Sequence, residues 1–119
     1  MPRDNIVEKL SQRDLFPGAL EMMVLQILRL QPTHGYALAQ RIKQMSNELL
    51  RVEEGSLYPS LQRLLKQGYV QAAWTQSATN RRIRVYRITR SGIRHLEREI
   101  SSFEQMLKGI SLVLAPAKF

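Results

Sequence analysis

The most chemically distinctive stretch of the sequence is a cluster of arginines in its second half. Within ten residues there are five of them, and no aspartate or glutamate occurs between Thr75 and Leu96. A charge run is commonly just a solvated surface, but guanidinium groups without acids beside them suit phosphate oxygens and a narrow minor groove. The cluster therefore favours a nucleic acid as partner; it comprises Arg81, Arg82, Arg84, Arg87 and Arg90.

A second polar cluster lies upstream, between Gly55 and Gly68. Four leucines (57, 61, 64 and 65) recur there with helical spacing, which predicts a helix with one apolar face. We expect Ser56 to cap it, Pro59 to lie in its first turn and Gly68 to follow its end. The other face has no acid and would suit a DNA groove; it holds Ser56, Tyr58, Ser60, Gln62, Arg63, Lys66 and Gln67.

Catalytic and metal-binding chemistry find no support. The absence of cysteine removes thiolate ligands and disulfides. The two histidines, His34 and His95, are far apart, and no nucleophile with a base, glycine-rich phosphate loop or credible carboxylate pair occurs. We expect no enzymatic activity, no metal and no cofactor. Gly35 and Tyr36 are instead placed to meet a phosphate at a helix N-terminus.

Bulk composition agrees with a binding role. The chain has 119 residues, which suits one domain with an appendage, and its formal net charge of +8 favours a polyanionic partner. No apolar run is long enough to span a membrane, and the first residues do not resemble a secretory signal. We therefore expect a soluble, cytoplasmic protein without a membrane role.

Two helices should precede the polar helix. Residues 1–14 are interpreted as a loose arm or a short extra helix. A helix from Pro17 to about Leu30 is apolar on most sides, as expected for burial in a core or an interface. A second helix should run from residue 35 to about residue 47, and a short, partly extended connector should follow. One side of this second helix is apolar through Leu38, Ile42, Met45 and Leu49.

After Gly68 the pattern changes from helical to alternating, which predicts a β-hairpin. Residues 70–75 form the first strand, 76–80 the turn and 82–89 the return strand. The alternation slips in the return strand, and either a bulge or burial on both faces would explain this. We expect Trp74, on the first strand, to pack into the core.

The last helix should carry a narrow apolar seam. Thr89 is its predicted cap and Pro116 its end. Its apolar residues repeat in heptads over about 35 Å, which is long for one domain and favours a homodimer contact. The first helix, with Leu15 and Phe16 just before it, would be the second part of that contact. The alternative is that the helix lies only on its own domain. The seam consists of Ile93, Leu96, Ile100, Phe103, Leu107, Ile110 and Leu114.

Together these elements predict a mainly α fold with a small β-hairpin, that is, a winged helix-turn-helix. Residues 15–89 would form the DNA-binding domain, 90–115 the dimerisation helix and 116–119 a tail. The third helix would enter the major groove of double-stranded DNA, and the hairpin, as the wing, would hold the backbone or the minor groove. Two copies would read a pseudo-palindromic operator.

The sequence also resembles a known family. GSLYPSLQRLLKQGYV, Trp74, the arginine-rich turn and VYRITRSG resemble the signature of PadR-family transcriptional regulators, and HGYALAQRI resembles the family's second helix. The resemblance covers roughly residues 15 to 105. VEEGSLYP is similar to a branch common in acidobacterial genomes, and the single short C-terminal helix is similar to the smaller subfamily.

The resemblance implies a bacterial homodimeric regulator, usually a repressor. Some members bind flat aromatic ligands in a pore at the dimer interface, which implies a small aromatic effector; here the last helix has Phe103 and no tryptophan. The alternatives are a winged-helix module that binds proteins, and a nucleic-acid-binding protein without operator specificity. The DNA contacts that the resemblance implies are Tyr36, Ser56, Tyr58, Pro59, Ser60, Arg63, Asn80, Arg81, Arg82 and Arg84.

Overall fold

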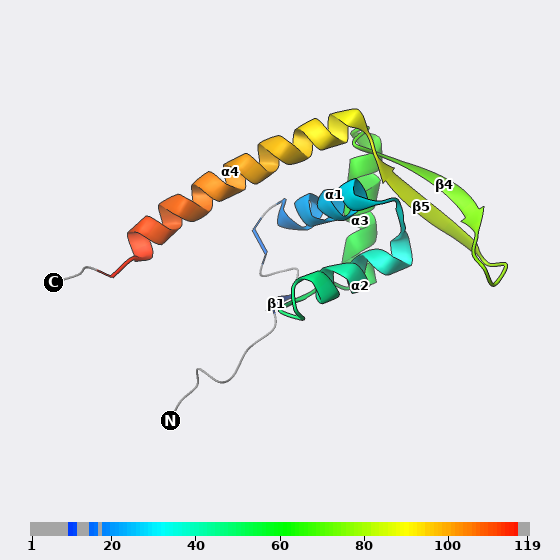
Figure 1. The fold of residues 1–119 in the computed structure, drawn as a ribbon, viewed down its shortest axis with the longest axis horizontal. Coiled ribbons are helices and arrows are strands. Elements are labelled where there is room, and N and C mark those ends of the chain that lie inside the picture. Colours follow the sequence, from blue (N-terminus) through cyan, green and yellow to red (C-terminus); the bar gives the residue numbers. More distant parts are fainter. Residues whose placement is uncertain (1–9, 12–14, 17, 117–119) are drawn as a thin grey trace, which may run out of the picture.

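The computed structural model describes residues 10–11, 15–16 and 18–116 (Figure 1). The helices there are α1 (Ala19–Leu30), α2 (Gly35–Met45), α3 (Glu54–Lys66) and α4 (Arg90–Leu114). The strands are β1 (Leu10–Ser11), β2 (Thr33–His34), β3 (Leu50–Arg51), β4 (Val70–Gln76) and β5 (Arg82–Ile88). This arrangement confirms the predicted fold class, with three helices followed by a wing and one long helix.

The core lies between α1, α2 and α3. Helix α1 is buried along much of its length, as its broad apolar pattern predicts. It begins at Ala19, after Gly18 in a left-handed conformation (φ +84°), rather than at position 17, which lies outside the described residues. Leu38 and Ile42 of α2 and three leucines of α3 (57, 61 and 64) pack against α1. The remaining buried members of the core come from the connector, the wing and α4: Val52, Val70, Tyr86 and Leu96.

Two boundaries differ from the prediction. Helix α3 begins at Glu54 with Glu53 at its N-cap, so Ser56 is not the cap and Pro59 lies beyond the first turn. Proline is tolerated there because Gly55, whose carbonyl loses its helical partner, is exposed to water. In α2 the predicted apolar side stops at Ile42. Met45 and Leu49 are about half exposed, because the helix ends at Met45 and the chain turns away.

The wing is a regular antiparallel hairpin. Its register runs without a bulge from Val70 paired with Ile88 to Gln76 paired with Arg82. Strand β5 is the middle strand of a three-stranded sheet, because β2 pairs with its other edge. The slip in alternation therefore reflects burial on both faces of β5, where Tyr86 is fully buried. The sequence did not predict β2, since two residues carry no periodic pattern.

Strand β1 pairs in parallel with β3, with Leu10 opposite Leu50 and Ser11 opposite Arg51. The prediction of a loose arm or a short helix is wrong for these two residues, because their backbone pairs with the connector between α2 and α3. The other residues of the predicted arm, 1–9 and 12–14, lie outside the described residues.

Helix α4 starts as predicted, since the Thr89 side chain accepts a hydrogen bond from the Gly92 amide at 3.0 Å. Its first half packs on α1, where Leu96 is fully buried and Arg29 pairs with Glu97 at 3.3 Å. Its second half extends beyond the helical body (Figure 1). The seam is therefore covered by this chain only in its first half; Leu107, Ile110 and Leu114 are 46%, 36% and 74% exposed.

Candidate nucleic-acid interface

The start of α2, the outer side of α3 and the wing meet around one hollow of about 270 Å³. Each element brings predicted residues to it: Tyr36 follows the first residue of α2, Tyr58 and Gln62 lie on α3, and Arg82 and Arg84 lie on β5. None of the lining residues is acidic. The complete lining is Gly35, Tyr36, Tyr58, Gln62, Trp74, Arg82, Ile83, Arg84 and Tyr86.

Aromatic rings form much of this lining. Tyr36 and Tyr58 are 60% and 41% exposed, so a ligand in the hollow could contact both side chains. Partial burial raises the pKa of the Tyr58 phenol above its ordinary value, and Tyr36, Glu54 and Tyr86 act in the same direction. Tyr58 therefore stays neutral at physiological pH and keeps a hydroxyl hydrogen to donate.

Trp74 also faces this hollow, which corrects the prediction that it packs into the core. It is 57% exposed, because β4 beyond Ala72 extends past the helices that would cover it. The Arg82 guanidinium lies 4.8 Å from the centre of its ring, and that of Arg84 lies 5.8 Å away. The cross-strand register explains this, since Trp74 pairs directly with Arg84 and lies diagonal to Arg82.

The wing arginines keep their charge available. Among the residues that the structure describes, none of Arg81, Arg82 and Arg84 forms an ion pair with an acid. Asn80 turns the hairpin with a left-handed backbone (φ +63°), and the Ser77 hydroxyl accepts a hydrogen bond from the Arg81 amide at 3.2 Å. The tip of the wing is thus held by local hydrogen bonds, and Arg81 and Arg82 on it are exposed.

The polar face of α3 is narrower than predicted. Ser60 is 1% exposed, since it follows Leu57 by three residues and precedes Leu64 by four, which puts it on the buried side. Arg63 turns toward α1, where its Nη2 and Nε donate to Glu21 Oε2 at 2.6 and 3.0 Å. Its Nη2 also donates to Ser60 Oγ at 3.1 Å. The exposed residues of the predicted face are Tyr58, Gln62, Arg63, Lys66 and Gln67, and Ser56 is partly buried. Pro59, beside this face, is also exposed.

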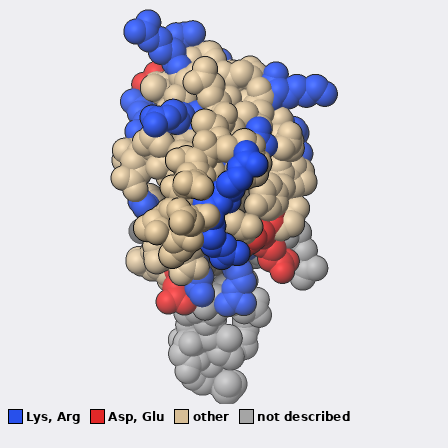
Figure 2. All heavy atoms as spheres, turned by 90° about the vertical axis from the view of Figure 1, so that its right-hand side faces the viewer, with Lys and Arg blue, Asp and Glu red and all other residues tan. Residues whose placement is uncertain are grey.

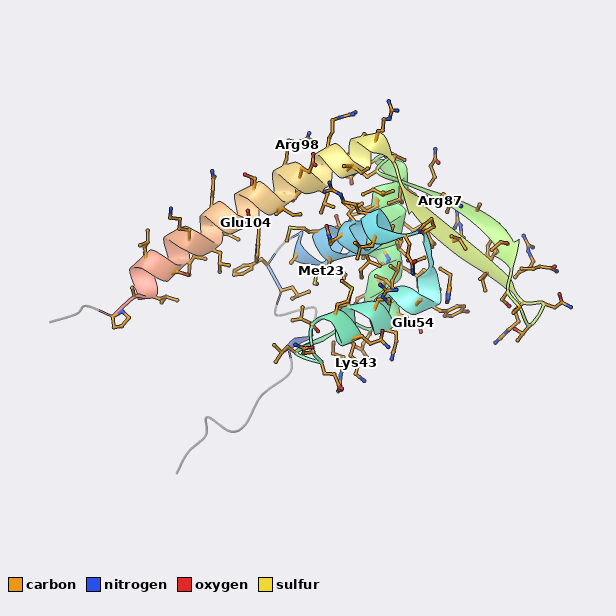
Figure 3. The ribbon with its side chains drawn as sticks, in the orientation of Figure 1. Met23, Lys43, Glu54, Arg87, Arg98 and Glu104 are labelled. Carbon is orange, nitrogen blue, oxygen red and sulfur yellow. The ribbon has the colours of Figure 1, made fainter. Side chains whose placement is uncertain are left out.

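The surface charge of the molecule is unevenly distributed between basic and acidic side chains. Figure 2 shows lysine and arginine side chains spread over the wing side of the molecule and gathered in a stripe through its middle, with acidic side chains toward the edges of the view. The earlier start of α3 places two exposed acids at its N-terminus, Glu53 at the N-cap and Glu54 in the first turn, whereas the sequence predicted an acid-free polar face. Glu54 lies at the beginning of α3, beside α2 (Figure 3).

Other kinds of site find no support in the described part of the chain. No group of three or more histidine, cysteine or acidic side chains there is placed to hold a metal ion. None of the helices in that part is long and apolar enough to cross a membrane. The cationic hollow, with the start of α2, the outer side of α3 and the wing around it, is therefore the strongest candidate site.

The fold and this site define a winged helix-turn-helix protein with a cationic face made by its third helix and wing. Residues 24–98 match the family model described as "Transcriptional regulator PadR-like family", and the chain belongs to that family. It is accordingly a transcriptional regulator and not an enzyme, which confirms both predictions.

Solved structures agree with this assignment. A transcriptional regulator from Clostridium thermocellum is 26% identical, with a TM-score of 0.76 over 82% of this chain and 95% of that one. A PadR-like regulator from Bacillus cereus is 26% identical, with a TM-score of 0.72 over 85% of this chain and 96% of that one. PadR of Bacillus subtilis, solved in complex with operator DNA, is 23% identical, with a TM-score of 0.62 over 69% of this chain and 46% of that one.

Proposed function

We propose that this regulator is a sequence-specific, homodimeric, cytoplasmic repressor that binds a pseudo-palindromic operator. The observation that carries the proposal is the acid-free hollow between the outer side of α3 and the arginine wing. A helix and a hairpin on one cationic face are suited to adjacent grooves of double-stranded DNA. The B. subtilis PadR structure, which holds operator DNA, supports this use of the fold.

The outer side of α3 would read base edges in the major groove, and the wing would hold the backbone or the minor groove. Tyr36 would meet a phosphate at the start of α2. Ser60 and Arg63 are left out of the contacts, because one is buried and the other is paired with Glu21. The proposed contacts are Tyr36, Ser56, Tyr58, Pro59, Gln62, Lys66, Asn80, Arg81, Arg82 and Arg84.

The second half of α4 supports the homodimer. Its exposed seam residues would pack against the same helix of a second copy, with Leu15 and Phe16 beside them. Phe16 already contacts Phe103 edge to face, with ring centroids 6.1 Å apart. Next to this pair is a second, smaller hollow of about 130 Å³, lined partly by Met22 and Met106. A small aromatic effector would find apolar surface there.

Fluorescence anisotropy tests the proposal. The purified protein is titrated against the DNA upstream of its own gene and against a scrambled duplex, at two salt concentrations. We expect about a thousandfold preference for the upstream DNA at moderate salt. Equal and steeply salt-dependent binding to both duplexes would instead indicate a non-specific nucleic-acid-binding protein. Binding to neither would favour the protein-interaction module.

A further inference from the structure

Trp74 is the single tryptophan of the chain, and its position is unusual for a large apolar side chain. It is 57% exposed on an outer strand and lines the hollow between α3 and the wing. Trp74 belongs neither to the buried core nor to the apolar seam of α4. An exposed tryptophan at a candidate binding surface calls for a role in that surface.

The surroundings of Trp74 indicate that role. The guanidinium groups of Arg82 and Arg84 both lie within 6 Å of its ring centre, the range of a cation–π contact. A ring attracts a guanidinium without accepting its N–H groups, so these stay open to phosphate oxygens. The Arg84 guanidinium also lies 5.8 Å from the centre of the Tyr86 ring, and its buried Nε has no hydrogen-bond partner among the described residues, so rings rather than an acid surround this side chain.

The position of the hollow indicates what it would receive. If α3 occupies the major groove and the wing the neighbouring minor groove, the strand that separates these grooves must pass between the two elements. The hollow lies between them, and its lining offers hydroxyl, amide and guanidinium donors but no carboxylate.

We propose that this hollow receives the sugar–phosphate backbone of the strand between the two grooves, an inference that rests on the proposed DNA binding. Trp74 is a positioning residue in it. Its ring holds the guanidinium groups of Arg82 and Arg84 toward the phosphates of that strand. Preorganised arginines lose less side-chain freedom on binding than free ones, so the ring increases affinity without reading sequence.

The first test uses Trp74 as its own reporter, because no other tryptophan contributes to the emission. Titration of the full-length protein with the upstream duplex should change Trp74 emission saturably, with the same midpoint as the anisotropy. Emission that stays constant while anisotropy saturates would overturn the proposal, since DNA would then bind away from the hollow.

The second test compares Trp74→Leu, Trp74→Phe and the control Thr75→Ala on the same strand, after circular dichroism has shown that each is folded. We expect Trp74→Leu to weaken binding about tenfold and to flatten the log K against log salt slope by about one to two units, because two arginines lose their alignment. Trp74→Phe should retain most of the DNA affinity and most of the salt slope, and Thr75→Ala should leave the affinity and the slope unchanged. Weaker binding with an unchanged slope would overturn the positioning role.

A double-mutant cycle completes the test. In a variant that already carries Arg82→Ala and Arg84→Ala, Trp74→Leu should lower DNA affinity less than about twofold, since no guanidinium remains to be aligned. A full tenfold cost in that background would overturn the inference and leave the proposed function intact. If the unaltered protein binds no duplex at all, both the inference and the proposed function are overturned.

Discussion

At the residue scale, Arg63 and Arg82 present the same guanidinium group to opposite kinds of neighbour. Arg63 donates twice to Glu21 and once to Ser60, so its charge is largely matched within the chain. Arg82 lies over the Trp74 ring and has no acid beside it among the described residues. An acid occupies the N–H groups that a phosphate would need, whereas a ring leaves them free.

We therefore predict that Arg63→Ala and Arg82→Ala differ in DNA affinity. Arg63→Ala should change the dissociation constant less than about threefold and leave the salt slope unchanged, and its exposed ion pair should contribute at most about 1 kcal/mol to folding. Arg82→Ala should weaken binding about tenfold and reduce the slope by about one unit. Anisotropy at two salt concentrations measures both. Equal losses would return Arg63 to the DNA contacts.

The Tyr58 hydroxyl gives a second prediction at this scale. Removing it with Tyr58→Phe should weaken DNA binding about three- to tenfold, the value of one hydrogen bond. The pKa of Tyr58 is raised by its burial and its neighbours, so the donor stays protonated through pH 9, and its ionisation should cause no loss of binding between pH 7 and 9. Tyr69→Phe is the control, because that ring stacks on His95 outside the hollow.

At the element scale, the long amphipathic patterns were the ones that sequence could predict. The leucines of α3 and the alternation of β4 identified their elements because each pattern repeats several times. Strand β2 was missed because two residues repeat nothing. The prediction for Trp74 is wrong because strand alternation predicts only on which face of the sheet a residue lies. Whether helices cover that face at Trp74 depends on how far the hairpin extends past them. Ser60 was misplaced although its spacing from Leu57 and Leu64 was visible in the sequence.

The wing as an element should supply non-specific affinity. We predict that Arg81→Ala with Arg82→Ala weakens binding to the upstream and scrambled duplexes alike and lowers the salt slope by up to about two units. The matched control is Arg94→Ala with Arg98→Ala, which removes the same charge from exposed positions on α4. If the control pair changes the slope equally, net charge rather than the wing explains the binding.

The junction between β4, β5 and α4 depends on Gly92. A Cβ at this position would collide with the Tyr69 carbonyl oxygen and with Ile88 Cγ1. We predict that Gly92→Ala lowers the free energy of unfolding by about 1–3 kcal/mol, as overpacking does elsewhere. Gly109→Ala, with nothing near its Cβ, should instead raise it by about 0.5–1 kcal/mol. Thermal denaturation compares the two, and equal effects would contradict the collision.

At the scale of the whole molecule, the second half of α4 is the least covered apolar surface among the described residues. Leu112, Val113 and Leu114 are 70%, 84% and 74% exposed, and Leu107 and Ile110 continue the seam toward the core. A second copy would cover this surface and fix the spacing of two α3 helices. The dimer would then set the distance between operator half-sites, about one helical turn of DNA or a multiple of it.

We predict that Leu107→Glu with Ile110→Glu yields folded monomers. These side chains are exposed in the single chain, whereas Phe103 packs on Phe16 and its replacement would also damage the fold. Lys108→Glu is the control, since it adds an acid on the same turn outside the seam. Sedimentation should show a monomer only for the seam variant, and circular dichroism an intact fold for both.

The same variant links assembly to operator binding. A monomer loses the second half-site and the high effective concentration that the dimer gives it, so its operator affinity should fall by a factor of about a hundred or more. Its affinity for a single half-site should change little, because the hollow and the wing are untouched. A seam variant that stays dimeric would disprove the interface. A monomer that retains full operator affinity would show that one α3 and one wing suffice to bind DNA.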